Sequence, residues 1–205
     1  MTGPIDDLAL NRATVAGYDN SVDSYAAGTD HAPTADHLQA LQRLVAAVGP
    51  GGRVLEVASG PGWDADLLET MGVTVDRTDQ SEGFIAFQAG RGKAVARLDL
   101  ISADLGGPWD GLVALYVIQH VGRGLVDGVI GRISAALRPG GTLLMSFQTG
   151  EGEQITTDAE GSYQVVRWRQ ADMIACLARH GLSIDWRSSF EGREGVWLTV
   201  IARRT

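Results

Sequence analysis

The chain contains very little cysteine. Cys176 is the single one in 205 residues, so an internal disulfide is excluded. No apolar run approaches the ~20 residues of a membrane-spanning helix. The N-terminus is polar, unlike the apolar segment of a secretion signal. We therefore expect a cytoplasmic protein with no membrane partner.

Basic charge is also scarce. Lysine and arginine number 17 against 25 acidic residues, and the net charge is −8. Nucleic-acid binding needs clustered basic side chains that displace counterions from phosphates, and here they are scattered. We therefore expect no nucleic-acid partner. We also find no metal-ligand spacing among histidine, cysteine and carboxylate residues, and no serine nucleophile elbow.

Strand and helix patterns alternate along a chain of single-domain length. Apolar runs predict strands at 53–57, 73–78, 95–98, 112–117, 142–147, 182–190 and 196–202. Helical spacing predicts helices at 34–48, 63–71, 82–91, 125–137 and 170–180, with short helices in a mobile arm at 1–30. This alternation predicts an α/β fold with a doubly wound, mostly parallel seven-stranded sheet. The last two strands are too close for a helical crossover, so they should be antiparallel.

A glycine loop follows the first predicted strand. Gly60 and Gly62 permit a sharp turn and close approach of a ligand, and the next helix directs free N–H groups at the same place. The loop also fits the dinucleotide pattern G-x-G-x-x-A, and Asp79 follows about 20 residues later, where a ribose-binding acid belongs. A nicotinamide cofactor is therefore one alternative.

Acidic residues near strand ends distinguish the cofactors. Glu56, one residue before the first strand ends, would repel a pyrophosphate but suits the ammonium of a methionine moiety. Asp99 closes the third strand, where an adenine amino group could bind. The C-terminal strand pair does not belong to a standard dinucleotide domain. These features favour S-adenosylmethionine over a nicotinamide.

Six motifs carry a family resemblance: VLEVASGPG, TVDRTDQS, ARLDL, WDGLVALYVIQHV, ALRPGGTLLMSF and VWLTVIARR. In this order they resemble class I S-adenosylmethionine-dependent methyltransferases over roughly residues 18–204. Ala58 stands where the family usually has its first glycine. The resemblance implies a single Rossmann-like domain over 1–205, with an N-terminal helical lid at 1–33 and a substrate-side insertion at 148–169. It also implies methyl transfer to an oxygen, nitrogen or carbon nucleophile of a small molecule.

The resemblance also assigns cofactor contacts, with S-adenosylhomocysteine as product. They are Glu56 for the methionine amino group, Ala58, Gly60 and Gly62 along the methionine moiety, Asp79 for the ribose hydroxyls, Gln80 or Phe84 beside the adenine, Asp99 and the Leu100 N–H at the adenine amino group, and Tyr116 and Val117 near the sulfonium. The alternatives are a helix cap for Asp79, a turn for Asp99, and core packing for Phe84 and Tyr116.

Two tyrosines precede the first strand. Tyr18 and Tyr25 are two helical turns apart, so both can face the same way. Many family members carry such a pair in a lid over the cofactor, where aromatic faces attract a sulfonium. The alternative is that both tyrosines simply pack on the sheet.

His120 is the best candidate for a general base, because it follows the fourth strand at its carboxyl end and titrates near neutrality. Loop stabilisation is its alternative role. His31 and His37 flank the first predicted helix of the sheet region, where they either edge the pocket or, as we expect, lie on the surface. His180 precedes a helix stop and should be structural.

Aromatic and basic residues suggest a substrate side. Tyr163, Arg167 and Trp168 are candidate acceptor contacts, with an arginine available for a carboxylate. Trp186 and Trp197 should be core residues. The sequence thus predicts a methyltransferase, with an NAD(P)-dependent oxidoreductase or an S-adenosylmethionine-binding protein without methyl transfer as alternatives.

Overall fold

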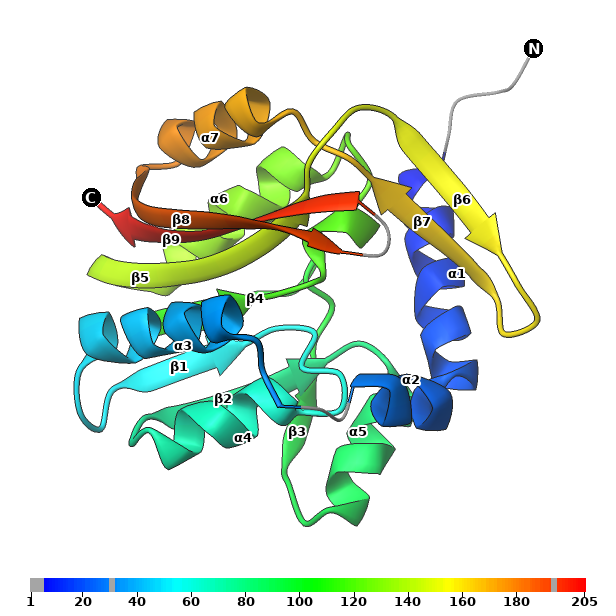
Figure 1. The fold of residues 1–205 in the computed structure, drawn as a ribbon, viewed down its shortest axis with the longest axis horizontal. Coiled ribbons are helices and arrows are strands. Elements are labelled where there is room, and N and C mark those ends of the chain that lie inside the picture. The colour runs from blue at the N-terminus through cyan, green and yellow to red at the C-terminus, as the bar shows by residue number, and fades with distance from the viewer. Residues whose placement is uncertain (1–5, 30–31, 193–194) are drawn as a thin grey trace.

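The structure is a computed structural model that describes residues 6–29, 32–192 and 195–205. Seven strands form one sheet in the order β3-β2-β1-β4-β5-β9-β8 (Figure 1). Their bounds are β1 (Arg53–Glu56), β2 (Thr74–Asp79), β3 (Val95–Arg97), β4 (Trp109–Ala114), β5 (Leu137–Gln148), β8 (Leu182–Gly192) and β9 (Gly195–Arg204). The first five are mutually parallel, and β9 is antiparallel to both neighbours. The predicted fold class is confirmed.

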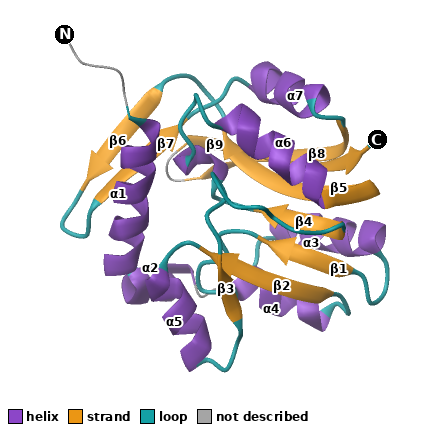
Figure 2. Cartoon of the chain, turned by 180° about the vertical axis from the view of Figure 1, so that it is seen from behind, coloured by secondary structure: helices purple, strands orange, loops and turns teal. Residues whose placement is uncertain are grey.

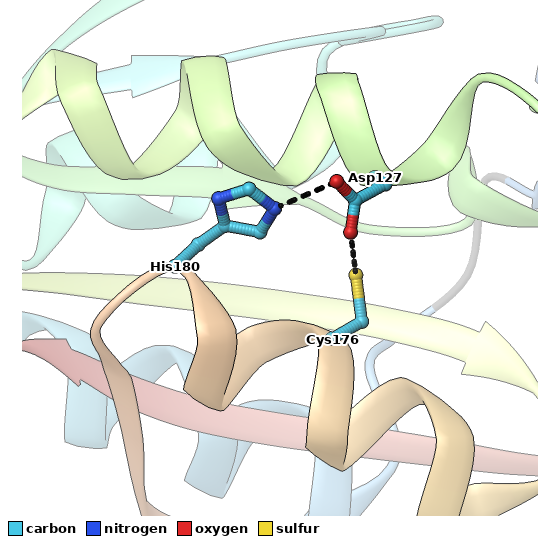
Figure 3. Close-up of side chains that lie close together, drawn as sticks. All are labelled: Asp127, Cys176 and His180. Carbon is cyan, nitrogen blue, oxygen red and sulfur yellow. Dashed lines mark hydrogen bonds and ion pairs between the residues drawn. The ribbon is translucent and has the colours of Figure 1, made fainter.

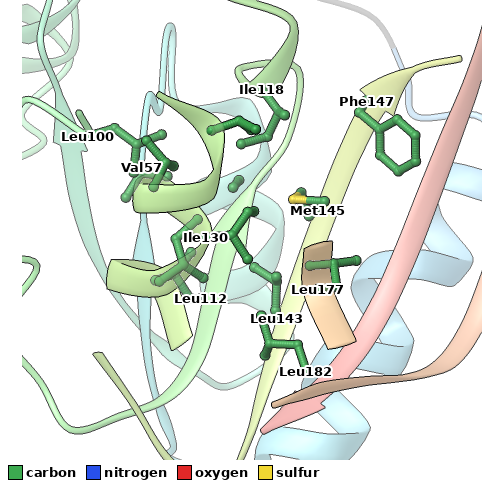
Figure 4. Close-up of a cluster of buried hydrophobic side chains, with 14 of the residues drawn as sticks. Val57, Leu100, Leu112, Ile118, Ile130, Leu143, Met145, Phe147, Leu177 and Leu182 are labelled. Atoms are coloured by element: carbon green, nitrogen blue, oxygen red, sulfur yellow. The ribbon is translucent and has the colours of Figure 1, made fainter. Parts of the chain in front are cut away.

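Helices cover both faces of this sheet. They are α3 (Ala35–Val48), α4 (Trp63–Thr70), α5 (Glu82–Gly90), α6 (Val126–Ala136) and α7 (Gln170–Arg179). In Figure 1, α3 lies in front of the sheet, whereas Figure 2, from behind, shows α6 and α7 in front. Two apolar clusters match these layers: α3 and α4 pack into one, and α6 and α7 into the other, larger one (Figure 4).

The amphipathic pattern of α3 explains its position. Leu41, Leu44 and Val48 recur at helical spacing and are buried against Val113 and Leu144 of the sheet. The Thr34 hydroxyl caps the helix by accepting the His37 N–H at 3.3 Å. The first turn of α3 is thereby fixed above the sheet.

The strand order creates a crevice between β1 and β4. Strand β1 pairs with β2 on one side and with β4 on the other, so the chain reverses its direction of winding there. The connections leave the carboxyl ends of these two strands in opposite directions, which opens a space for a ligand. The glycine loop, defined here as residues 58–62, lies at this point.

The N-terminal helices and a hairpin lie beside the sheet. The helices are α1 (Asp7–Asn20) and α2 (Val22–Thr29), and the hairpin consists of strands β6 (Glu153–Thr157) and β7 (Ser162–Val166). Helix α1 packs along β7 in both views. A Cβ on Gly161 would lie 2.5 Å from the Cα of Gly17, so this close approach requires glycine. The hairpin was not predicted.

The fourth strand ends earlier than the predicted 117. Strand β4 stops at Ala114, because Tyr116 takes a left-handed φ of 54° and a 3₁₀ turn follows at Ile118–His120. Among the described residues, no helix is both long enough and apolar enough to cross a membrane.

The central position of Leu112 generates a stability prediction. Its side chain is fully buried in β4, between Leu55 of β1 and Leu143 of β5. We expect Leu112→Ala to lower the free energy of unfolding by about 2–5 kcal/mol, because it removes buried methyl groups and leaves a cavity. Leu8→Ala, at a residue that is 44% exposed, should change it by less than about 0.5 kcal/mol. Equal effects of the two substitutions in urea denaturation would contradict this core assignment.

Candidate active site

A cavity of about 540 Å³ lies at the carboxyl ends of β1, β2 and β4, beneath α1 and α2. Most of the predicted site residues line it: Tyr18, Tyr25, Glu56, Ala58, Gly60, Asp79, Gln80, Phe84, Asp99, Leu100, Tyr116, Val117 and His120. Four do not: Gly62, Tyr163, Arg167 and Trp168. Residues far apart in the sequence thus meet around one space.

Left-handed backbone shapes the glycine loop. Ala58, Gly60 and Gly62 have φ values of 52°, 55° and 85°. This conformation suits glycine and costs an alanine roughly 1–2 kcal/mol, which explains the family's usual glycine at position 58. A Cβ on Gly60 would meet nothing within 4 Å, whereas one on Gly62 would lie 2.4 Å from Gln88 Oε1. Gly62 therefore serves packing, and its predicted position along the ligand is not supported.

A buried arginine holds this loop. The Arg77 side chain on β2 donates to the Gly62 carbonyl at 3.3 Å and to Gln88 Oε1 at 3.1 Å. It also pairs with Asp66 of α4 at 2.7 Å. Gln88, which Arg77 holds in place, in turn donates through Nε2 to the Gly60 carbonyl at 2.8 Å. The loop is thus tied to β2, α4 and α5 together.

Glu56 is a buried carboxyl at the cavity wall, 3% exposed. Its pKa is raised to about 8, first by burial and then by the charge of Asp64. The hydroxyl of Ser59 donates to it. Near neutral pH this group is therefore largely protonated, and an incoming cation would favour its ionised form.

Asp79 and Asp99 hold the turns at the ends of β2 and β3. Asp79 accepts the N–H groups of Gly60 and Ser81, each at 2.8 Å, and burial raises its pKa. The alternative of Asp79 as a helix cap is wrong, since Ser81 caps α5. Asp99 accepts from Ile101 N–H at 2.8 Å. Asp99 thus fixes its turn and also lines the cavity.

A cluster of aromatic rings lies where the N-terminal helices α1 and α2 meet the cavity. The Tyr18 ring centroid lies 5.4 Å from that of Tyr25, 6.1 Å from Phe84 and 5.2 Å from Tyr163. Tyr25 also contacts Phe84 edge-on at 5.5 Å. Tyr18 and Tyr25 therefore form part of the cavity wall, and Tyr163 supports Tyr18 without lining it.

His120 is held by partners on both ring nitrogens. Nδ1 lies 2.6 Å from the Gln164 carbonyl, which can only accept, so Nδ1 carries the proton. Nε2 lies 2.8 Å from the Tyr18 hydroxyl, which donates to it. Burial lowers the pKa of His120 to about 4. The imidazole is therefore neutral at physiological pH.

The expectation that His37 lies on the surface is wrong. His37 lines the cavity, with Nε2 at 2.6 Å from Asp64 Oδ1 and Nδ1 at 3.3 Å from the Tyr116 hydroxyl. Helical spacing contained the clue, because His37 shares the face of Leu41 and Leu44 that turns toward the sheet. His31 lies outside the described residues.

Trp197 is buried, as expected, but it also lines the cavity. It lines the cavity from β9 together with Phe190 of β8, and its ring centroid lies 5.2 Å from that of Tyr116. The hairpin of β8 and β9 brings both rings over the carboxyl end of β4. Alternation along a strand does not predict which ring faces a ligand.

None of the three predicted acceptor contacts lines the cavity. Trp168 is 7% exposed and packs in the larger core cluster, under the Arg123 guanidinium. Arg167 lies on the hairpin and donates to Gln154 at 3.2 Å. The unpredicted hairpin is the physical reason, because it directs these side chains away from the cavity.

A separate polar cluster joins α6 to α7 (Figure 3). Cys176 donates through Sγ to Asp127 at 3.6 Å, and His180 Nε2 lies 3.2 Å from the same carboxylate. This grouping was not predicted from the sequence. Arg179 pairs with Asp127 at 2.8 Å, and burial raises the pKa of Cys176 to about 11. The cluster is thus a neutralised contact between helices, and none of it lines the cavity.

Comparison with protein families identifies the class. A family model described as a methyltransferase domain matches residues 30–187. The chain therefore belongs to the methyltransferase domain family, and its fold is that of class I S-adenosylmethionine-dependent methyltransferases. This membership decides against the nicotinamide alternative. No curated protein sequence matches the chain.

Several solved structures share the fold. The 1,6-didemethyltoxoflavin-N1-methyltransferase of Burkholderia thailandensis, with bound S-adenosylhomocysteine, is 18% identical, with a TM-score of 0.76 over 100% of this chain and 93% of that one. DhpI in complex with S-adenosylhomocysteine (SAH) is 26% identical, with a TM-score of 0.71 over 95% and 97%. CalS10, an amino pentose methyltransferase from Micromonospora echinaspora, is 18% identical, with a TM-score of 0.66 over 89% and 96%.

The pKa of Glu56 generates a pH prediction. It is about 8 in the folded state, whereas a glutamate in an unfolded chain titrates near ~4.3. Between these values the folded state holds one more proton than the unfolded state. The free energy of unfolding of the wild type, relative to Glu56→Gln, should therefore fall from about pH 5 to about pH 8 by at most ~1.4 kcal/mol per unit. Urea denaturation across this range checks the slope, and a constant difference would contradict the assignment.

Proposed function

We propose that this methyltransferase binds S-adenosylmethionine in the cavity and transfers its methyl group to an oxygen, nitrogen or carbon nucleophile of a small molecule. S-Adenosylhomocysteine is the product. One observation carries the proposal: Glu56, Asp79 and Asp99, from the ends of three neighbouring strands, surround one cavity beside the glycine loop.

The chemistry of these groups fits the donor. Asp79 keeps lone pairs free on both oxygens for two ribose hydroxyls, although it already accepts two N–H bonds. Asp99 and Leu100 suit the adenine amino group and ring edge. Buried Glu56 suits an ammonium, whose charge would offset the cost of ionising it. When bound, S-adenosylmethionine supplies an electrophilic methyl group on a good leaving group.

The remaining cofactor contacts extend this assignment. Ala58 and Gly60 leave room along the methionine chain, since a Cβ on Gly60 points into open space. Gln80 and Phe84 flank the adenine, and Tyr116 and Val117 lie toward the sulfonium. Tyr18 and Tyr25 cover the donor from above.

The acceptor is a small molecule without a strong negative charge. Among the described residues that line the cavity there is no lysine or arginine, while Glu56, Asp64, Asp79 and Asp99 are acidic. A carboxylate or phosphate on the acceptor would thus lack a strong cationic partner. The toxoflavin-type and amino pentose enzymes named above favour an acceptor from secondary metabolism.

Tyr18 and His120 can remove the acceptor's proton. As the bond from the acceptor to the methyl carbon forms, the acceptor's proton passes to the Tyr18 oxygen, and the Tyr18 proton passes along its 2.8 Å hydrogen bond to His120 Nε2. The Gln164 carbonyl then stabilises the imidazolium through Nδ1–H. In this scheme Tyr18 touches the acceptor, and His120 positions Tyr18 and receives its proton.

Cofactor binding is the first test. Calorimetry should detect binding of S-adenosylhomocysteine to the wild type, and Asp79→Asn should raise its Kd by about 10- to 100-fold, because a carboxylate that accepts ribose hydroxyls is lost. Asp185→Asn, on β8 and outside the cavity, is the control. Failure of the wild type to bind would overturn the proposal. If the wild type binds S-adenosylhomocysteine but forms none from S-adenosylmethionine with hydroxyl, amine or carbon-acid acceptors, a binding protein without methyl transfer is favoured.

The proton relay yields a kinetic prediction. With an acceptor that must lose a proton, Tyr18→Phe should lower kcat roughly 100-fold or more, while the affinity for S-adenosylhomocysteine changes little because the ring remains. His120→Gln should do the same, and the double variant should add little, since both act in one relay. Tyr163→Phe, which supports Tyr18 but does not line the cavity, is the matched control. Additive effects of the two substitutions would refute the relay.

A further inference from the structure

One end of the cavity contains an ion pair with no assigned role. His37, in the first turn of α3, and Asp64, in the first turn of α4, meet with Nε2 and Oδ1 2.6 Å apart. Asp64 lies two residues after the glycine loop, and its charge is close enough to raise the pKa of Glu56. The pair therefore lies beside the two features that we assign to the methionine part of the donor.

That part of the donor is a zwitterion, with an ammonium and a carboxylate on one carbon. Glu56 provides a partner for the ammonium, but the carboxylate needs a cation or strong hydrogen-bond donors. The described residues around the cavity include no lysine or arginine. Among these described residues, the groups able to carry positive charge are the imidazoles of His37 and His120.

The two imidazoles differ in their environment. Burial lowers the pKa of His120 to about 4 and keeps the ring neutral, although the bond to the Gln164 carbonyl opposes this shift. Burial also lowers the pKa of His37, but the hydrogen bond and charge of Asp64 outweigh it, and the net shift is upward. The Tyr116 hydroxyl lies 3.3 Å from Nδ1. Burial and the charge of Asp64 raise its pKa to about 12, so it remains a donor.

We infer that the His37–Asp64 pair binds the methionine zwitterion head to tail. His37 and the Tyr116 hydroxyl contact the carboxylate, and Asp64 together with Glu56 contacts the ammonium. This inference rests on the proposed function, since it concerns the same donor. Each charge of the ligand then faces an opposite charge, so the acidic end of the cavity accepts a carboxylate without an arginine.

Ligands that differ only in the amino-acid part provide the test. Calorimetry compares S-adenosylhomocysteine, its carboxamide, and 5′-deoxy-5′-methylthioadenosine, which keeps the adenosine and sulfur but lacks the amino acid. His37→Phe keeps an aromatic ring beside Tyr116 and removes the charge, and Asp64→Asn removes the partner. His180→Gln, between α6 and α7, is the matched histidine control.

We expect His37→Phe to raise the Kd of S-adenosylhomocysteine by about 10- to 100-fold, the effect of losing a charge-assisted bond. Its Kd for the carboxamide should change far less. Asp64→Asn should weaken both of these ligands, because both keep the ammonium. Methylthioadenosine should bind all variants like the wild type, which also shows that the cavity is intact.

Two results would overturn the inference separately from the proposed function. In one, wild type binds S-adenosylhomocysteine and His37→Phe binds it equally well. In the other, His37→Phe weakens S-adenosylhomocysteine and methylthioadenosine by the same factor. If the wild type binds no S-adenosylhomocysteine, the proposed function fails and this inference fails with it.

Discussion

The buried guanidinium of Arg77 is the interaction on which the site depends. An arginine with 2% of its side chain exposed is tolerated only where its donors are matched, and here Asp66, Glu69, Gln88 and the Gly62 carbonyl match them. These partners come from α4, α5 and the glycine loop. Because all of them bind one side chain of β2, the two helices and the loop are held in fixed positions relative to the sheet. A loop with three left-handed residues would otherwise have little reason to keep a single conformation.

This rigidity has an electrostatic consequence. Because the glycine loop is fixed, Glu56 stays buried beneath it, and burial holds its carboxyl in the protonated form near neutrality. Asp79 is likewise buried, with its oxygens aligned by Gly60 and Ser81. Ionising a carboxyl that is buried in this way costs desolvation energy. A ligand with positive charge and hydroxyl donors relieves it, so binding energy comes from groups arranged before the ligand arrives.

The sequence predicted the sheet, its antiparallel end and the cavity wall, because these depend on local signals. Strand runs, glycine turns and acids at strand ends follow from residue type and spacing. It failed where position depends on contacts between distant segments. The hairpin of β6 and β7 is stabilised by α1, more than 130 residues earlier, through bonds such as Gln164 N–H to Thr14. Arg167 and Trp168 were expected at the acceptor because the hairpin was not predicted. The pairing of His37 with Asp64 was not predicted because it depends on which face of α3 His37 occupies.

His37 and His120 both line the cavity, but their different surroundings give them different charge states. His120 contacts a carbonyl and a hydroxyl, and burial keeps the ring neutral, with Nε2 able to accept a proton. His37 contacts a carboxylate, which favours the charged ring. A neutral imidazole suits proton transfer during reaction, and a charged one suits binding of an anion. Binding and proton removal are thus assigned to different groups around one cavity, so the groups that hold the donor need not change protonation when the acceptor reacts.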